Sequence, residues 1–215
     1  MAGERLVPVL APLVPLFPDG GLRRGSTVVV TAVAGGATSL ALAVGAAPSQ
    51  AGSWCAAVGW PTLGMVAAVG LGVALERFAL VPHPGEQWAA VTAALIDAVD
   101  VILVRPPPGV RLADARRLVA RARERGVVLV VCPAPQGAGA WPGGSDLQLV
   151  VAEAGRWRGL EYGHGYLQAR SVAVTSIGRG AASRQRRVSL WLPGADGALS
   201  EEQAHAGVAT TSVAG

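Results

Sequence analysis

The stretch Ser26-Thr-Val-Val-Val-Thr-Ala-Val-Ala-Gly-Gly-Ala-Thr-Ser-Leu40 decides the fold of this chain. Its β-branched first half predicts a strand, its two glycines predict a turn, and the small apolar residues 40–47 predict a helix. A strand that enters a helix through a glycine turn is typical of phosphate-binding loops, because backbone amides at a helix start face the anion. The positions of such a loop are Gly35, Gly36, Ala37, Thr38 and Ser39.

The side chains that give such a loop its chemistry are missing. A Walker A loop has a lysine that meets the β- and γ-phosphates, followed by a hydroxyl that holds Mg²⁺. Here Ala37 stands at the lysine position, Thr38 follows it, and the whole chain contains no lysine. Because a methyl group cannot offset the charge of a triphosphate, we expect a loop kept for packing, with no cofactor and no enzymatic activity.

The pattern around this unit alternates strands and helices. After the first strand and helix we expect strands at residues 54–59, Phe78–Val81, 100–104 and 127–132, with helices at residues 63–72, 85–98 and 112–124. Three further strand candidates at residues 147–152, 169–177 and 188–192 follow without helices between them. The expected fold class is therefore α/β, with a mostly parallel central sheet flanked by helices and antiparallel strands at its C-terminal end.

The length of 215 residues is enough for one domain with a sizeable core. We expect an N-terminal segment at residues 1–25 and a domain at residues 26–193. Residues 194–215 are small and polar without apolar periodicity, which predicts a disordered tail.

Two features bear on location. No charged residue lies between Arg24 and Glu76, but glycines and Pro61 divide this stretch, so a buried parallel sheet is favoured over a membrane span. Cys55 and Cys132 lie in apolar runs typical of buried thiols in a reducing compartment, and no metal-ligand spacing exists among the histidines. Because prolines break the apolar N-terminus, a signal peptide is not expected, and the expected location is the cytoplasm.

The charged residues form two basic groups. All 18 basic residues are arginine, against 14 acidic ones, and the net charge of +4 permits contact with nucleic acid or an acidic protein. The first group lies on the helix expected at residues 112–124 and is either a solvated helix face or a binding face. Its members are Arg111, Arg116, Arg117, Arg121, Arg123 and Arg125.

The second basic group lies in the turn expected at residues 178–187, between the last two strands. Turn residues expose their side chains, so this turn is a candidate contact for DNA or a protein partner. Its arginines are Arg179, Arg184, Arg186 and Arg187, and Trp191 on the following strand is a further candidate.

The order of these elements resembles the RecA core. The resemblance rests on Gly20-Gly-Leu-Arg-Arg-Gly25 before the first strand, the turn Ala34-Gly35-Gly36, the helix start Gly85-Glu-Gln87 and the strand Val99-Asp-Val-Ile-Leu-Val104. It covers about residues 5 to 193 and is strongest to the short, degenerate RecA-like proteins of actinobacteria called ImuA-prime. Such proteins are implicated in an SOS-induced mutagenic complex with ImuB, an inactive relative of Y-family polymerases, and an error-prone DnaE-type polymerase.

The departures from active RecA proteins all remove catalytic groups. Arg105 stands where the resemblance places the Walker B aspartate, and Gly59-Trp60-Pro61 stands where it places the catalytic glutamate. Arginine at this point would repel a metal ion. The loops that would bind DNA also lack positive charge, since only residues 106–109 and 133–145 correspond to them.

The sequence therefore predicts a non-catalytic RecA-fold adaptor of mutagenic translesion synthesis that binds ImuB, with the polymerase and DNA as further partners. The resemblance implies that the C-terminal part of the chain contacts ImuB. Two alternatives stay open: a residual nucleotide-binding ATPase that uses arginine in place of lysine, and a SulA-like inhibitor of cell division. Self-association also stays open.

Overall fold

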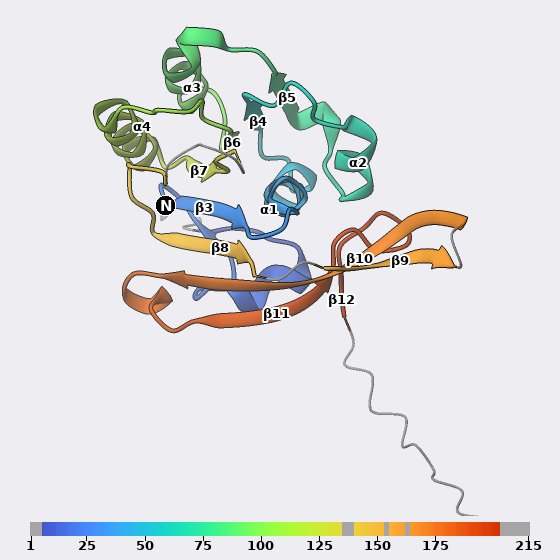
Figure 1. The fold of residues 1–215 in the computed structure, drawn as a ribbon. Helices are drawn as coiled ribbons and strands as arrows, with labels where there is room; N and C mark the ends of the chain where they lie inside the picture. The colour runs from blue at the N-terminus through green and yellow to red at the C-terminus, as the bar shows by residue number, and fades with distance from the viewer. Residues whose placement is uncertain (1–5, 135–139, 153–154, 162–163, 203–215) are drawn as a thin grey trace, which may run out of the picture.

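The computed structural model of the protein describes residues 6–134, 140–152, 155–161 and 164–202. One large sheet dominates the fold (Figure 1). In spatial order its strands are β12 (Ser200–Glu201), β11 (Arg186–Trp191), β10 (His164–Gly178), β8 (Leu147–Val151), β3 (Thr27–Ala32), β7 (Val128–Val131), β6 (Val101–Val104), β4 (Cys55–Val58) and β5 (Phe78–Val81). The strands from β8 to β5 are parallel, whereas β10, β11 and β12 continue the sheet antiparallel from β8.

This architecture confirms the expected α/β class with its antiparallel C-terminal strands. The physical reason is visible in the middle strands, where every residue of β4, β6 and β7 is buried. Strands covered on both faces read as continuous apolar runs, and such runs occur in this sequence between helical segments.

Helices cover the two faces of the sheet. The longer helices are α1 (Ala37–Gln50), α2 (Met65–Gly70), α3 (Trp88–Ile96) and α4 (Leu112–Arg125), and short 3₁₀ turns lie at η1 (Ala11–Leu16), η2 (Leu75–Arg77), η3 (Gly85–Gln87) and η4 (Gly180–Ala182). On one face α1, α2 and η1 bury Leu40, Ala68 and Leu13 in a common core. On the other face α3 and α4 bury Ile96 and Leu118 against β4, β6 and β7.

The N-terminal segment is part of this fold. β1 (Leu6–Val7) pairs with β2 (Leu22–Arg23), and η1 between them places Leu13 and Leu16 in the core shared with β10 and β11. The hydroxyl of Ser176 on β10 donates to the carbonyl of Leu16 at 2.7 Å. Residues that precede the first expected strand therefore cover one face of the antiparallel extension.

The C-terminal region differs from the expectation in its tail and in an additional strand, among other places. The predicted disordered tail is wrong for residues 194–202, because β12 pairs with β11 and the amide of Gly194 donates to the carbonyl of Ala198 at 2.7 Å. Backbone pairing orders this segment, and Leu199 also packs against the hydrophobic core. The rest of the predicted tail lies outside the described residues. The second difference is β9 (Arg156–Glu161), which pairs with β10 and was not expected because its sequence lacks apolar alternation.

Within the described parts of the chain, no helix is long and apolar enough to cross a membrane. The uncharged stretch after Arg24 is divided among β3, α1, β4 and α2, as its glycines indicated.

Candidate functional site

The loop between β3 and α1 has the expected strand-turn-helix form. The amide of Val33 donates to the carbonyl of Val151 at 3.0 Å and continues the pairing of β3 with β8. Gly35 and Gly36 then take φ values of 85° and 100°, which side chains with a Cβ rarely adopt. Gly36 is the N-cap of α1 and provides no side-chain cap. The first backbone amides of α1 therefore lie near the carboxyl end of β3 without a capping side chain.

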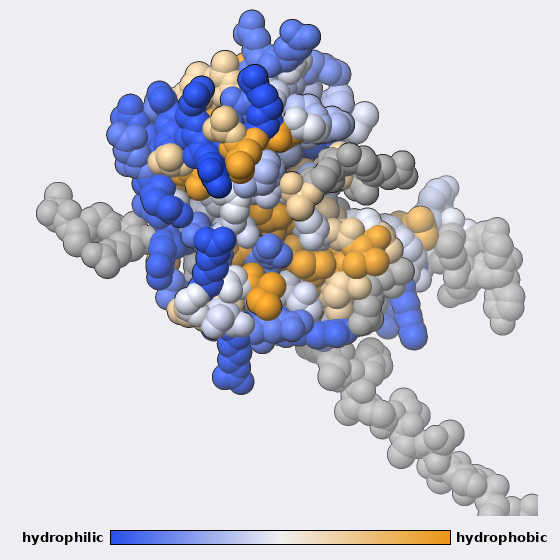
Figure 2. All heavy atoms as spheres, turned by 60° about the vertical axis from the view of Figure 1, so that its left-hand side comes forward, coloured by the Kyte–Doolittle hydropathy of each residue, from blue (hydrophilic) through white to orange (hydrophobic). Residues whose placement is uncertain are grey.

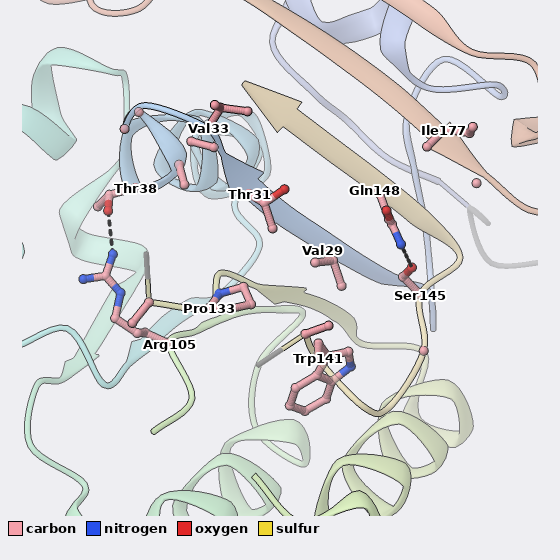
Figure 3. A pocket seen from close by; sticks show the side chains of 18 of the residues that line it. Val29, Thr31, Val33, Thr38, Arg105, Pro133, Trp141, Ser145, Gln148 and Ile177 are labelled. Carbon is pink, nitrogen blue, oxygen red and sulfur yellow. Dashed lines mark hydrogen bonds between the residues drawn. The ribbon is translucent and has the colours of Figure 1, made fainter. Parts of the chain in front are cut away.

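Arg105 lies across this loop. It directly follows β6, which is separated from β3 by β7, and its Nη2 donates to the Thr38 hydroxyl at 2.6 Å (Figure 3). Thr38 is the residue whose hydroxyl would hold Mg²⁺ in an active loop. Because a guanidinium group already uses that hydroxyl, a metal ion would have to compete with a fixed positive charge for the same oxygen.

Trp60 completes the same cluster. It follows β4, is 2% exposed, and lies under the Arg105 guanidinium at 5.1 Å from the ring centre. Gly59, before it, has a φ of 84°, and a Cβ there would stand 2.3 Å from the carbonyl oxygen of Arg105. Arg105, at the expected Walker B position, therefore contacts both Thr38, at the position of the expected metal hydroxyl, and Trp60, at the position of the expected catalytic glutamate.

A buried thiol lies beside the cluster. Burial raises the pKa of Cys132, while the charge of Arg105 and its hydrogen bond to this side chain oppose the rise. The other cysteine, Cys55, is also free and buried, and burial followed by the charge of Asp100 raises its pKa to about 12. Both cysteines are thus neutral packing residues, and among the described residues no group of His, Cys, Asp or Glu could hold a metal ion.

A second arginine reaches the loop from the opposite side, and sequence reasoning did not find it. Arg170 on β10 is 8% exposed, and its Nη2 donates to the carbonyl of Ala34 at 2.8 Å. Its guanidinium also lies 5.7 Å from the ring centre of Trp157 on β9. No local pattern marks this residue, because its partners come from distant segments. Together with Arg105 it holds the loop between two cations.

The loop opens into a cavity of about 730 Å³ on the sheet. Its walls include Thr38, Arg105, Trp141 and Arg179, and its floor is formed by strand residues such as Val29. No aspartate or glutamate occurs among the described residues that line it. The cavity therefore combines an apolar floor with a positively charged rim.

The basic helix α4 is mainly structural. Arg121 and Arg125 pair with Asp97 after α3, and Arg123 contacts Asp146 before β8 at 3.4 Å. The hydrogen bond from Arg121, followed by charge attraction to both arginines, lowers the pKa of Asp97. Arg111 pairs with Asp114 within the helix. Of the arginines in the first basic group, only Arg116 and Arg117 have no ion pair in the described structure, which favours a solvated face over a binding face.

The second basic group is divided by the fold. Arg179 and Arg184 are exposed in the turn around η4, as expected. The expected position of Arg186 and Arg187 in that turn is wrong, because both lie in β11, paired with Ser176 and Thr175 of β10. Strand pairing extends further toward the turn than the apolar pattern of residues 188–192 indicated.

Trp191 lies on the same strand. It is half-buried and is covered by the guanidinium of Arg158 on β9, 4.4 Å from the ring centre. Because residues alternate along β11, Arg187 and Trp191 share one face of the sheet, whereas Leu190 points into the core. The structure thus places Arg187 and Trp191 on the outward face and Arg179 at the cavity rim.

Comparison with known proteins places the chain in a family. The uncharacterized protein Rv3395c of Mycobacterium tuberculosis is 44% identical over 100 residues, which are 46% of this chain and 49% of that protein. The match therefore spans about half the length of this relative. A family model, the MT3502 N-terminal domain, matches residues 15–143, a segment that contains the loop, Trp60 and Arg105. Since this match covers more than half of the chain, the protein belongs to the MT3502 N-terminal domain family.

Proposed function

We propose that this protein is a non-catalytic RecA-fold adaptor of the ImuA-prime kind, which acts in the cytoplasm in damage-induced mutagenic translesion synthesis. Its partner is ImuB, with an error-prone DnaE-type polymerase or DNA as further contacts. The match to a mycobacterial protein supports an actinobacterial family of this kind.

One observation carries the non-catalytic part of the proposal. The Arg105 guanidinium donates to the hydroxyl of Thr38 and stacks on Trp60, so it contacts both other positions that would serve hydrolysis. Phosphoryl transfer depends on metal ions that neutralise the developing charge and on a residue that orients the attacking nucleophile. A cation and an indole at these positions supply neither function. The fold instead offers exposed surfaces to which a protein partner can bind.

The test is complex formation in the absence of nucleotide. The full-length chain is co-expressed with a candidate ImuB, and the complex is measured by size-exclusion chromatography with light scattering. We expect a stable complex whose formation is unaffected by ATP and Mg²⁺. The adaptor proposal fails if no complex forms while ATP with Mg²⁺ raises the melting temperature, because that result favours the residual nucleotide-binding protein. Binding to FtsZ instead of ImuB would favour the SulA-like alternative.

The DNA contact has its own test. Fluorescence anisotropy with labelled single-stranded DNA compares the wild type with Arg184→Glu in the η4 turn and Arg116→Glu on α4, two exposed arginines. If the turn binds DNA, only Arg184→Glu weakens binding, and the affinity of the wild type falls with added salt. Equal effects of the two variants would mean that the contact is a general consequence of net charge.

A further inference from the structure

The connection between β7 and β8 leaves part of the sheet uncovered. These parallel strands lie on either side of β3, and such strands are usually joined by a crossover that contains a helix. The described parts of this connection, residues 132–134 and 140–146, contain turns and no helix. The helical layer of α3 and α4 therefore ends above β7, and the same face of β3, β8 and β10 has no helix over it in the described structure.

The strand register defines the residues of this open face. Val29 on β3 pairs with Gln148 on β8, which pairs with Ile177 on β10. Figure 3 shows these three side chains on neighbouring strands around the cavity. The next row of paired residues on the same face consists of Thr31 on β3, Val150 on β8, Thr175 on β10 and Arg187 on β11.

The open face is apolar for an exposed surface. Val33, just after β3, is 75% exposed, and Ile177 is 44% exposed, although both are large hydrophobic residues. Figure 2 shows hydrophobic side chains across the middle of one face of the molecule, with strongly hydrophilic ones around them. Hydrophobic surface with a polar rim is a mark of a binding site for another macromolecule.

The dimensions fit one α-helix. Adjacent strands lie about 4.8 Å apart, so β3, β8 and β10 together span about 10 Å, which is close to the diameter of a helix. Strands β3 and β8 are long enough for about three helical turns. The open face is thus about as wide and as long as the crossover helix that the described residues between β7 and β8 do not form.

The rim determines the charge of the occupant. Arg105 and Arg179 line the cavity and give its rim a positive charge. Since no carboxylate lines the cavity among the described residues, an acidic occupant is favoured over a basic one. DNA fits less well, because nucleic-acid interfaces are more polar and more strongly positive than a floor with exposed Val33 and Ile177.

We infer that the open face of β3, β8 and β10 docks an acidic amphipathic helix of about three turns from a partner protein. Its apolar side would lie on Val33 and Ile177, and its carboxylates would meet Arg179 at the cavity rim. This inference deepens the proposed adaptor function and rests on it for the expectation that the partner is a protein.

Two carboxylate substitutions on the floor test the surface by affinity. Val33→Asp and Ile177→Asp remove apolar contact and repel an acidic helix, and Val66→Asp is the matched control, since Val66 is 89% exposed on α2 over the opposite face. Calorimetry with a candidate ImuB should show at least about tenfold weaker binding for each floor variant and no change for the control. Thermal melts must show that all three variants fold. Binding by the wild type that neither floor variant weakens would overturn the inference and leave the adaptor function intact.

A photo-crosslinker identifies the occupant directly. A benzoylphenylalanine at Gln148, an exposed floor position, is activated in cells, and the captured peptide is sequenced. The expected adduct is an acidic helical segment that, made as a synthetic peptide, binds the purified chain and loses affinity for Ile177→Asp. Capture of DNA, of a second copy or of the chain's own residues 203–215, or no adduct at all, would overturn the inference. If the captured segment meets the expectation but belongs to another protein and ImuB does not bind, the inference stands and the proposed function fails.

Discussion

Arg105 should exclude Mg²⁺ from the loop even when the missing lysine is restored. Mg²⁺ needs its oxygen ligands at about 2.0–2.1 Å. The Nη2 atom of Arg105 lies 2.6 Å from the hydroxyl of Thr38, so a bound ion would stand roughly 4.5 Å from the guanidinium. At an effective dielectric constant of about 20, the repulsion between a divalent and a monovalent cation at that separation is about 7 kcal/mol. Such a cost lowers affinity roughly 10⁵-fold.

The perturbation is a pair of variants, Ala37→Lys and Ala37→Lys with Arg105→Met. The first restores the lysine and keeps the repelling arginine, whereas the second also removes the charge and keeps an apolar stem over Trp60. Loss of the charged hydrogen bond to Thr38 should cost the second variant about 2 kcal/mol of unfolding free energy, so circular dichroism must first show that it is folded.

The assay is the melting temperature with and without ATP and Mg²⁺. A ligand at a hundred times its Kd adds about 2.7 kcal/mol of stability, which in a domain of this size raises Tm by about 5 to 10 °C. We expect no Mg²⁺-dependent shift for the wild type or for Ala37→Lys, and a measurable shift only for the double variant. A shift of several degrees in Ala37→Lys, present with Mg²⁺ and absent without it, would refute the electrostatic reasoning.

Four further outcomes are expected. Asp146 accepts from the buried amide of Thr27 at 2.8 Å, so Asp146→Ala should lower the unfolding free energy in urea by about 2 to 3 kcal/mol, against less than about 1 kcal/mol for Asp19→Ala in the exposed pair with Arg23; equal losses would contradict this. The lowered pKa of Asp97 gives stability that is present above about pH 4 and is lost as pH falls through the folded-state pKa, so acid titration of Asp97→Asn should lack this part of the decline, and identical curves would disprove it. Because burial raises the pKa of Cys55 to about 12 and also raises that of Cys132, a thiol reagent at pH 8 should label neither cysteine before unfolding and both after it. Gly59→Ala should cost more than about 1 kcal/mol in the same urea assay and more than Gly52→Ala, since both have positive φ but only the Cβ at Gly59 meets backbone atoms of Arg105.

The part of the candidate site that could be predicted consists of residues whose positions follow directly from the order of strands and turns along the chain. Ala37 and Thr38 follow the glycine turn directly, and Arg105 and Trp60 follow strands whose carboxyl ends must meet at one edge of a parallel sheet. The absence of a lysine or a carboxylate at these positions is therefore written in the sequence. The hydrogen bond from Arg105 to Thr38 and its stacking on Trp60 do not, because the direction of a side chain depends on how the strands are spaced.

The role of Arg170 and the presence of strand β9 could not be predicted from the sequence. The contact between Arg170 and the carbonyl of Ala34 joins segments far apart in the chain, and only antiparallel pairing of β10 with β8 brings them together. The polar residues of β9 carry no apolar period, since that strand pairs through its backbone with one neighbour. The number of arginines likewise overstated the positive charge that α4 has free for binding, because several of these arginines form ion pairs with Asp97 and Asp146.

The sequence by itself determined the α/β class, the order of strands and helices in the parallel part, and the absence of lysine from the loop between β3 and α1. These properties are local, because apolar period, turn residues and single substitutions are written along the chain. Only the tertiary structure decided that two arginines close on the loop, that residues 194–202 return to the sheet, and that no described helix covers β3, β8 and β10. Those properties depend on which distant strands become neighbours, and strand register is fixed only when the whole sheet assembles.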